Sequence, residues 1–437
     1  MAAASTARRL RPDLDIVAFE KGEHTSYSAC GIPYLVGGEV HRVEQLVART
    51  PQEFRDQHRI DVRIRHEAMG IDLDRREVEV RDHDHGRTFR LGFDQLLVAT
   101  GARPRRPPIP GIDLPHVFGV QTLGDGARLL DALEERQPKR AVVVGGGYIG
   151  LEMAEAMLRR GLQVTVVEQA PEVMRTLDPD MAAMVSRAMR RHGIDVRTGT
   201  TTTAFEDGVV QTDGGDLPAD VVVLGLGVQP NSEIAEEAGI ALGAGGAIGV
   251  NRTQRTSADG VWAAGDCAES YHLVTNRKVH VALGTVANKQ SRVAGINIAG
   301  GYATFPGVVG TAVSKVCSTE VARTGLTEHE AQRDGFGYET ATIESTTRAG
   351  YFPGAAPITV KLLAEKRSGR LLGGQIVGEE GAAKRIDVLA TALHAQMTVE
   401  DMTHLDLSYA PPFAPVWDPV LVAARVAAST IAEERAG

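Results

Sequence analysis

A single cysteine in a run of small residues is the part of the sequence best suited to chemistry. Cys30 lies within residues 26–34, and Gly31 and Pro33 follow it. Because proline suits the first turn of a helix, we expect Cys30 at or just before a helix N-terminus. Unpaired N–H groups and the helix dipole would there lower the pKa of the thiol. A buried structural cysteine is the alternative, since free cysteine is among the most buried residue types.

No second cysteine stands near Cys30 in the sequence, so it cannot close a local redox disulfide. A reactive sulfur at this position would exchange with a small thiol or react with an oxidant. We expect the two other cysteines, Cys267 and Cys317, to be structural. Three scattered cysteines give neither a disulfide framework nor zinc-type spacing, which favours a reducing, cytoplasmic compartment and predicts no metal site.

Length and composition restrict the class of protein. A chain of 437 residues predicts about three domains, and 43% hydrophobic with 24% charged residues is typical of a globular protein. The net charge of −9 argues against nucleic acid or an anionic membrane as a partner. No apolar run reaches the roughly 20 residues that cross a bilayer, and residues 1–10 resemble no secretory signal.

The strongest motif begins with an apolar strand over residues 140–144. It runs into residues 145–150, Gly-Gly-Gly-Tyr-Ile-Gly, which match GxGxxG, and a helical pattern follows. A second strand, 163–167, leads to Glu168, which stands 18 positions after Gly150. The acid that binds a ribose is expected about 20 positions after the motif. Strand, turn, helix, strand and acid in this order predict a dinucleotide site.

Each part of this motif has a physical role. Gly145 allows the tight turn, Gly147 lets the backbone approach a pyrophosphate, and Gly150 lets helix and strand pack closely. The diphosphate would rest on the helix N-terminus. A carboxylate at Glu168 accepts a hydrogen bond from a ribose 2′-hydroxyl and repels a 2′-phosphate, which favours NADH over NADPH.

Other strands also end in residues suited to a nucleotide. A helical pattern over residues 2–10 leads to a strand over 16–20 that ends in Glu20, as in the second half of a βαβ unit. The apolar strand before Gly265-Asp266 delivers this pair to its carboxyl end, where α/β sheets bind ligands. Residues 62–64 and 77–80 alternate as small antiparallel strands do.

The pattern changes to an α+β region after residue 305, with no nucleotide motif. We expect strands at 308–317, 340–344, 358–363 and 371–377 and a helix at 385–397. The apolar and aromatic stretch 409–419 is typical of a packing or subunit surface.

On these residues the chain resembles the pyridine nucleotide–disulfide oxidoreductases, and within them the single-cysteine branch that includes coenzyme A-disulfide reductase and NADH oxidase. The resemblance covers nearly the whole length. Its motifs are Glu20-Lys21-Gly22, residues 26–34, Thr100-Gly101, residues 145–168, Gly265-Asp266 and residues 409–412. Ala29 stands where that branch often has asparagine.

The resemblance implies an α/β fold with two Rossmann-type nucleotide-binding domains and a C-terminal α+β dimerisation domain. The FAD-binding domain would comprise residues 1–112 and 233–303, the NAD(P)H-binding domain 113–232, and the dimerisation domain 304–437. The first strand and glycine turn of the FAD-binding unit are missing from the chain as written, so we expect it to hold FAD weakly.

The resemblance also implies roles for individual residues. Glu20 would hold the FAD adenosine ribose, Asp266 the ribityl chain, and Cys30 would face the flavin. Tyr409 and Tyr351 would reach the cysteine site of the partner subunit in a homodimer. The expected catalytic residues are Cys30, Tyr351 and Tyr409, and the expected cofactor-binding residues are Glu20, Lys21, Thr100, Gly101, Gly145, Gly147, Gly150, Glu168, Gly227 and Asp266.

The activity implied is FAD-dependent reduction of a low-molecular-weight disulfide by NAD(P)H, with coenzyme A disulfide as the first choice of substrate. An NADH oxidase or peroxidase would instead cycle Cys30 through sulfenic acid. A persulfide reductase would use the same single thiol. A non-catalytic flavoprotein redox sensor is the alternative from another functional class.

Overall fold

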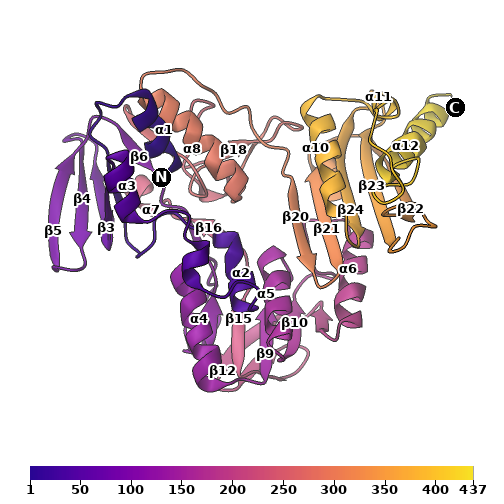
Figure 1. The fold of residues 1–437 in the computed structure, drawn as a ribbon, viewed down its shortest axis with the longest axis horizontal. Helices are drawn as coiled ribbons and strands as arrows, with labels where there is room; N and C mark the ends of the chain where they lie inside the picture. The colour runs from indigo at the N-terminus through magenta and orange to yellow at the C-terminus, as the bar shows by residue number, and fades with distance from the viewer. Residues whose placement is uncertain (437) are drawn as a thin grey trace.

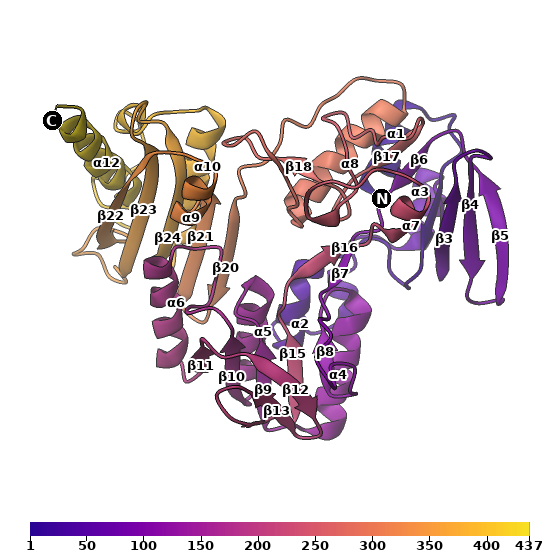
Figure 2. The same ribbon diagram turned by 180° about the vertical axis from the view of Figure 1, so that it is seen from behind.

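The chain forms three lobes in the computed structural model, which describes residues 1–436 (Figures 1 and 2). The first lobe carries the N-terminus, and the C-terminal lobe lies on the other side of the molecule. A middle lobe, built around residues 117–224, lies below and between them.

The middle lobe is a five-stranded parallel sheet in the order β11-β10-β9-β15-β8. Its central strands are runs of valine buried on both faces, as all-parallel sheets require. The register places Val142 opposite Val222. The elements of this region are β8 (Val117–Gly119), α4 (Leu123–Arg136), β9 (Arg140–Val144), α5 (Tyr148–Arg159), β10 (Gln163–Glu168), α6 (Pro179–Arg191), β11 (Asp195–Thr198), β12 (Thr202–Glu206), β13 (Val209–Thr212), β14 (Leu217–Pro218) and β15 (Val221–Leu224).

Two different layers cover this sheet. Leu129, Leu151 and Met181, one from each of α4, α5 and α6, join the core on one face. On the other face, Phe205 and Val210 of the antiparallel sheet β12-β13-β14 pack against the strands. The glycine turn and Glu168 lie at the sheet edge where β9 and β10 end.

The first lobe holds two parallel strand pairs, β1–β2 and β6–β17, which within residues 1–436 are separate sheets. An antiparallel sheet β3-β4-β5 stands at its outer side (Figures 1 and 2). The elements are α1 (Ala2–Leu10), β1 (Val17–Glu20), α3 (Pro51–His58), β2 (Asp61–Ile64), β3 (His66–Asp72), β4 (Glu77–Asp82), β5 (Arg87–Gly92), β6 (Leu96–Val98), α7 (Glu233–Glu237), β17 (Val261–Ala263), β18 (Ser270–Tyr271), β19 (Lys278–Val279) and α8 (Gly284–Ile298). Helix α2 (Ile32–Val36) comes between β1 and α3 in the chain but packs against α4 and α5 of the middle lobe (Figure 1).

One strand prediction is wrong in its pairing. Residues 61–64 form β2, which pairs in parallel with β1 rather than antiparallel, and Val62 is buried. The run 77–80 lies in β4, which is antiparallel to β3 and β5 as expected. Alternation of apolar and polar residues predicts a strand but carries no information on the direction of its partner.

Two of the passages of the chain between the first and middle lobes pair with one another. Strand β7 (Ala102–Pro104) runs antiparallel to β16 (Val228–Pro230). The Asn231 side chain donates to the Thr100 carbonyl at 2.9 Å, and Arg103 donates to the Asn231 side chain at 2.8 Å. These contacts fix the first lobe relative to the middle lobe.

The C-terminal lobe is an antiparallel sheet in the order β20-β21-β24-β23-β22. Helices α10 and α12 share a core with Val360, Leu362 and Ile376 of its strands, and α6 of the middle lobe contacts β21 and β24. The elements are β20 (Ala312–Val316), β21 (Thr319–Gly325), α9 (Glu328–Arg333), β22 (Tyr338–Thr346), β23 (Pro357–Glu365), β24 (Leu371–Gly378), α10 (Ile386–His394), α11 (Val399–Met402) and α12 (Pro419–Ala436).

Across the described helices, none is long and apolar enough to cross a membrane.

Candidate active site

Cys30 lies in a 3₁₀ turn that leads directly into α2, as the sequence predicts. The turn comprises Ala29–Gly31, and Pro33 stands in the first turn of α2. The Gly31 N–H donates to the Ser28 carbonyl at 2.9 Å, and the Ser28 N–H donates to the Leu46 carbonyl at 2.8 Å. The Cys30 side chain is exposed, so the alternative of a buried structural cysteine is wrong.

The turn is held from below by packing that only glycine allows. A Cβ on Gly31 would stand 2.3 Å from a methyl group of Leu46. Ile32, Leu35 and Val36 of α2 are buried in the core shared with α4 and α5. The thiol is therefore presented on a rigid turn rather than on a mobile loop.

The charges around Cys30 differ from the sequence expectation. Partial burial, followed by the negative charges of Glu152 and Asp266, raises the pKa of the Cys30 thiol. The expected lowering of this pKa is therefore wrong for the chain alone. Helix α2 has only five residues, and the groups that face the sulfur are carboxylates, which oppose its ionisation.

Glu152 comes to Cys30 from α5 of the middle lobe. Its carboxylate accepts a hydrogen bond from the Ser314 hydroxyl of β20 at 3.1 Å. Burial raises the pKa of Glu152. The sulfur thus lies where elements of all three lobes meet, and Glu152 is a site residue that reasoning from the sequence missed.

Tyr34 is a second residue that reasoning from the sequence missed. It follows Cys30 by four positions on a continuous helical turn, a spacing that places two side chains on one face, and it is 40% exposed. Burial and the charges of Glu152, Glu155, Glu39 and Cys30 raise the pKa of its phenol. The spacing after Cys30 was the signal available in the sequence.

The glycine turn of the middle lobe has the geometry that the motif predicts. Gly145 has a φ of 103°, and a Cβ there would stand 2.4 Å from the Gly225 carbonyl oxygen. A Cβ on Gly150 would stand 2.0 Å from the Gly145 oxygen. Near Gly147 the space is open, with only the Gly225 oxygen at 3.9 Å. A pyrophosphate can therefore approach the backbone at Gly147.

Glu168 ends β10 beside this turn. Its two carboxylate oxygens accept hydrogen bonds from the N–H groups of Gly146 and Ala170, each at 2.8 Å. The side chain is nearly buried. A carboxylate offers about four lone-pair positions, so two remain for ribose hydroxyls, and the residues present fit an NAD(H) ribose.

The first-lobe residues expected at FAD lie at strand ends. Glu20 accepts from the Gly22 N–H at 2.7 Å, and Lys21 is exposed. The Thr100 hydroxyl donates to the Asn231 carbonyl at 2.5 Å. Gly101 and Gly227 both have a positive φ, at 69° and 79°, in the passages between the lobes.

Asp266 is half-buried after β17, and burial raises its pKa. Among residues 1–436 its carboxylate has no hydrogen-bond partner, which fits a site for a polyol chain such as the FAD ribityl group. The buried side chain of Gln290 shapes the loop around it, accepting from the Gly265 N–H and donating to the Glu269 carbonyl, each at 2.9 Å.

Tyr351 and Tyr409 do not join this site in one protomer. Tyr351 lies between β22 and β23, and Tyr409 follows α11; both belong to the C-terminal lobe. Figures 1 and 2 place β22 at the far end of the molecule from α2. Desolvation and the neighbouring Tyr351 phenol raise the pKa of Tyr409. Both tyrosines are exposed, together with Phe413, Val416 and Trp417.

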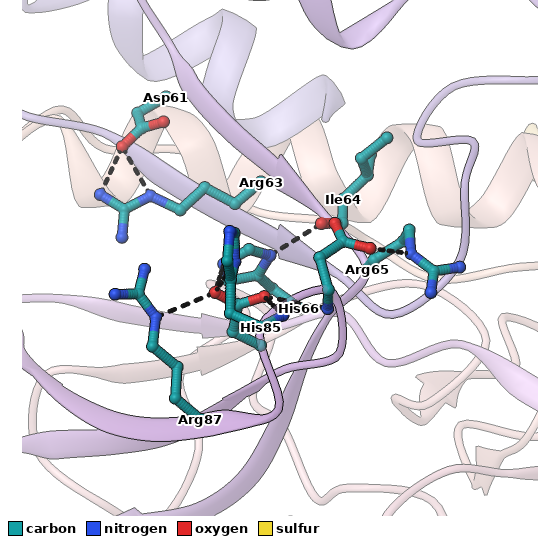
Figure 3. Close-up of polar contacts among 9 residues, drawn as sticks. Asp61, Arg63, Ile64, Arg65, His66, His85 and Arg87 are labelled. Carbon is teal, nitrogen blue, oxygen red and sulfur yellow. Dashed lines mark hydrogen bonds and ion pairs between the residues drawn. The ribbon is translucent and has the colours of Figure 1, made fainter.

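A cluster of charged side chains surrounds Arg65 and His66, at the end of β2 and the start of β3 (Figure 3). Asp82 is buried and accepts from the His85 ring at 2.8 Å and from Arg87 at 3.0 Å. Although burial opposes ionisation, these bonds lower the pKa of Asp82. The Arg65 side chain bonds to Asp84, and its backbone N–H donates to the Gly22 carbonyl at 3.0 Å. The cluster is a structural brace for the loop after Glu20.

Comparison with known families agrees with this geometry. Residues 1–291 match the pyridine nucleotide-disulphide oxidoreductase family, and residues 311–419 match the dimerisation domain of that family. The chain belongs to this family. Its α/β fold with a C-terminal dimerisation domain, and its assignment as a flavin-dependent oxidoreductase that uses FAD and NAD(P)H, are thereby confirmed.

Several members of the family are similar over nearly the whole chain. An NAD(P)H sulfur oxidoreductase (CoA-dependent) of Pyrococcus furiosus is 39% identical over 98% of this chain and 96% of that protein. A coenzyme A disulfide reductase of Staphylococcus epidermidis is 30% identical over 94% and 93%. A solved structure, that of an NAD-dependent persulfide reductase from A. fulgidus, has 40% sequence identity to this chain. It superposes with a TM-score of 0.96 and covers 99% of this chain and 82% of that one.

Replacing Glu152 by glutamine should lower the pKa of Cys30, because a negative charge beside a thiol opposes its ionisation. Alkylation of Cys30 by iodoacetamide, followed residue by residue with mass spectrometry, should then accelerate at a lower pH than in the native holoenzyme. The control is Glu135→Gln, which alters an exposed carboxylate of α4. If the pH dependence of Cys30 alkylation is the same in Glu152→Gln as in the native enzyme, the charge of Glu152 does not raise the pKa of Cys30.

The native enzyme should prefer NADH over NADPH, since the 2′-phosphate would meet the Glu168 carboxylate. The expected penalty is about 1–3 kcal/mol in kcat/KM. Glu168→Gln should narrow the preference, whereas Asp195→Asn, which alters an exposed carboxylate at the start of β11, should keep it. Equal kcat/KM for both nucleotides in the native enzyme would refute the role of Glu168.

Proposed function

We propose that this oxidoreductase reduces the S–S bond of a small coenzyme A derivative, the disulfide or the persulfide, at Cys30. The observation that supports this most is the lone exposed thiol on a rigid turn, beside Glu152 of the nucleotide-binding lobe and Asp266 of the flavin lobe. Relatives named for CoA-dependent sulfur reduction and for coenzyme A disulfide support the choice of substrate class.

The other cysteines are poor candidates for the reacting sulfur. Cys267 is fully buried, and its Sγ lies 3.5 Å from the Ala264 carbonyl oxygen. Burial and then the charge of Glu155 raise the pKa of Cys317 to about 11. The pKa of Cys30 is raised as well, but among the three cysteines Cys30 is the exposed one. Because disulfide exchange needs a sulfur that the substrate can reach, Cys30 is the nucleophile in this proposal.

The reaction at Cys30 has two parts. The Cys30 thiolate attacks one sulfur of the substrate, which forms a mixed disulfide, and the other sulfur leaves as a thiolate that takes up a proton. Two electrons and one further proton then cleave the mixed disulfide, which releases the second thiol and restores the Cys30 thiolate. Bound FAD supplies the route by which the two electrons of NAD(P)H reach this sulfur.

The protein supplies geometry and protons for these steps. Glu168 and the turn at Gly145–Gly150 hold NAD(P)H, while Glu20, Lys21, Thr100, Gly101 and Asp266 serve FAD. Tyr34 lies beside Cys30 in the same subunit, and its raised pKa keeps the phenol protonated as a donor. Tyr351 and Tyr409 act in trans, because their exposed aromatic surface forms the contact between subunits of a homodimer.

NADH oxidase activity is the second candidate. An NADH oxidase of Methanocaldococcus jannaschii is 37% identical over 96% of this chain and 94% of that protein. In that case Cys30 would be oxidised to a sulfenic acid. Oxygen uptake measured beside disulfide and persulfide turnover separates the two functions.

The cytoplasmic location of the protein stays a prediction from its few, scattered cysteines.

Cys30→Ser should abolish reduction of coenzyme A disulfide and of the persulfide, since no other exposed cysteine is present among residues 1–436. NADH should still bleach the flavin or reduce an artificial dye, because that transfer does not involve the sulfur. Cys267→Ala and Cys317→Ala are matched controls that should keep turnover. Retained S–S reduction in Cys30→Ser would exclude the proposed mechanism.

Mixed dimers should test whether Tyr409 acts across the subunit contact. Cys30→Ser and Tyr409→Phe homodimers should each have little activity, and exchange of subunits should restore part of the active sites. Tyr34→Phe, which changes a residue of the same subunit, should fail to complement Cys30→Ser. If verified subunit exchange recovers no activity with Tyr409→Phe, this tyrosine does not act in trans.

A further inference from the structure

The segment 173–180, here called the bridging segment, lies directly against the glycine turn. The Met174 N–H donates to the Gly146 carbonyl at 2.8 Å. Thr176 donates its hydroxyl to the Tyr148 phenol at 3.3 Å. Gly146 is itself held by Glu168. The bridging segment therefore supports two residues of the turn that receives the nucleotide.

The same segment is bound to the C-terminal lobe on its other side. Arg323 of β21 donates to the Thr176 carbonyl at 3.0 Å. The Asp178 N–H donates to the Gln375 side-chain oxygen at 2.7 Å, and the Gln375 amide donates back to the Asp178 carboxylate at 2.6 Å. The other Asp178 oxygen accepts from the Glu328 N–H at 2.9 Å.

A buried lysine completes this contact. Lys361 of β23 lies 3.2 Å from Asp178 and 2.8 Å from Asp180, and it also pairs with Glu328. Only 2% of Asp178, 3% of Gln375 and 4% of Lys361 is exposed. The three carboxylates could suggest a cation site, but the lysine ammonium already neutralises part of their charge.

Contacts of this kind hold the segment to the C-terminal lobe rather than merely near it. Removing one partner of a buried hydrogen-bonded or charged pair is costly, because the other is left unpaired. The bridging segment is therefore held to the C-terminal lobe by buried contacts on its own side chains and backbone. Any displacement of that lobe also displaces the supports of Gly146 and Tyr148.

We propose that the bridging segment couples the seating of the C-terminal lobe to the affinity of the NAD(P)H turn. Thr176, Asp178 and Gln375 are positioning residues, because they act on the nucleotide through Gly146 and Tyr148. The proposal rests on the nucleotide turn alone and not on the substrate of Cys30. Its failure would therefore leave the proposed function untouched.

The first test removes the contact between the segment and the turn. NAD⁺, which cannot reduce the flavin, is titrated calorimetrically into oxidised holoenzyme. Thr176→Val should weaken NAD⁺ binding about two- to tenfold, the effect of one hydrogen bond. Thr176→Ser keeps the hydroxyl and should bind as the native enzyme does. Native affinity in Thr176→Val would overturn the proposal.

The second test acts from the C-terminal lobe. Gln375→Leu should weaken NAD⁺ binding by a similar factor, although it does not contact the turn. Arg323→Lys, which shortens the reach to the Thr176 carbonyl, tests the same link if Gln375→Leu does not fold. The matched control is Ser318→Ala, which removes a different contact between these lobes, the hydrogen bond to His192.

Comparison of the variants separates coupling from general damage. FAD content should equal the native value in every variant, and a lower thermal midpoint alone does not change the affinity of the folded enzyme. Thr176→Val combined with Gln375→Leu should lose less affinity than the product of the single losses, because both act through one segment. Native affinity in Gln375→Leu and Arg323→Lys, or equal weakening by Ser318→Ala, would overturn the coupling.

Discussion

The seating of helix α5 on strand β9 is the contact on which the rest of the structure depends. At Gly150 a side chain would collide with the backbone of Gly145, so the helix reaches its position only because no Cβ is present. Its first turn then leaves backbone N–H groups at the carboxyl edge of the parallel sheet, where a diphosphate is attracted by unpaired donors and the helix dipole. A Cβ at position 150 would push the helix away from the Gly145 backbone and disturb the turn that receives the diphosphate.

From that position α5 reaches both other lobes. Glu152 points toward the Cys30 turn and bonds to Ser314 of β20, and the Glu155 carboxylate accepts from the Cys317 N–H at 2.8 Å. On another side of the helix, Ala156 packs against Gly37 at the end of α2. One helix thus sets the distance between the glycine turn and the Cys30 sulfur. Neither the glycine turn nor the Cys30 turn needs a flexible loop to position it.

The electrostatics of Cys30 follow from the same packing. Two carboxylates lie near Cys30, and each has a separate structural reason for its position. Glu152 lies at the contact with β20, and Asp266 ends the strand expected to serve the FAD ribityl chain. Burial, followed by the charges of Glu152 and Asp266, raises the pKa of the Cys30 thiol. In such a site, protonation of the Cys30 sulfur responds to changes in the charge of the neighbouring carboxylates.

The sequence by itself determined the features that arise within a few residues of backbone. It predicted the glycine turn with Glu168, the helix start after Cys30 and the change to an α+β lobe, because tight turns, proline at a first helical turn and valine-rich strands have local physical causes. It could not give the direction of β2, since a short alternating strand pairs in either direction.

Only the tertiary structure decided which charges meet. Glu152 and Cys30 are far apart along the chain, and no local pattern records that the charge of Glu152 acts on the Cys30 thiol. Asp178 and Gln375 are also far apart in the sequence, yet they are joined by two hydrogen bonds. The raised pKa of Cys30 and the contacts of the bridging segment arise from packing between lobes. Residue types set the possible interactions, but the direction of a pKa shift depends on distances that the folded chain alone provides.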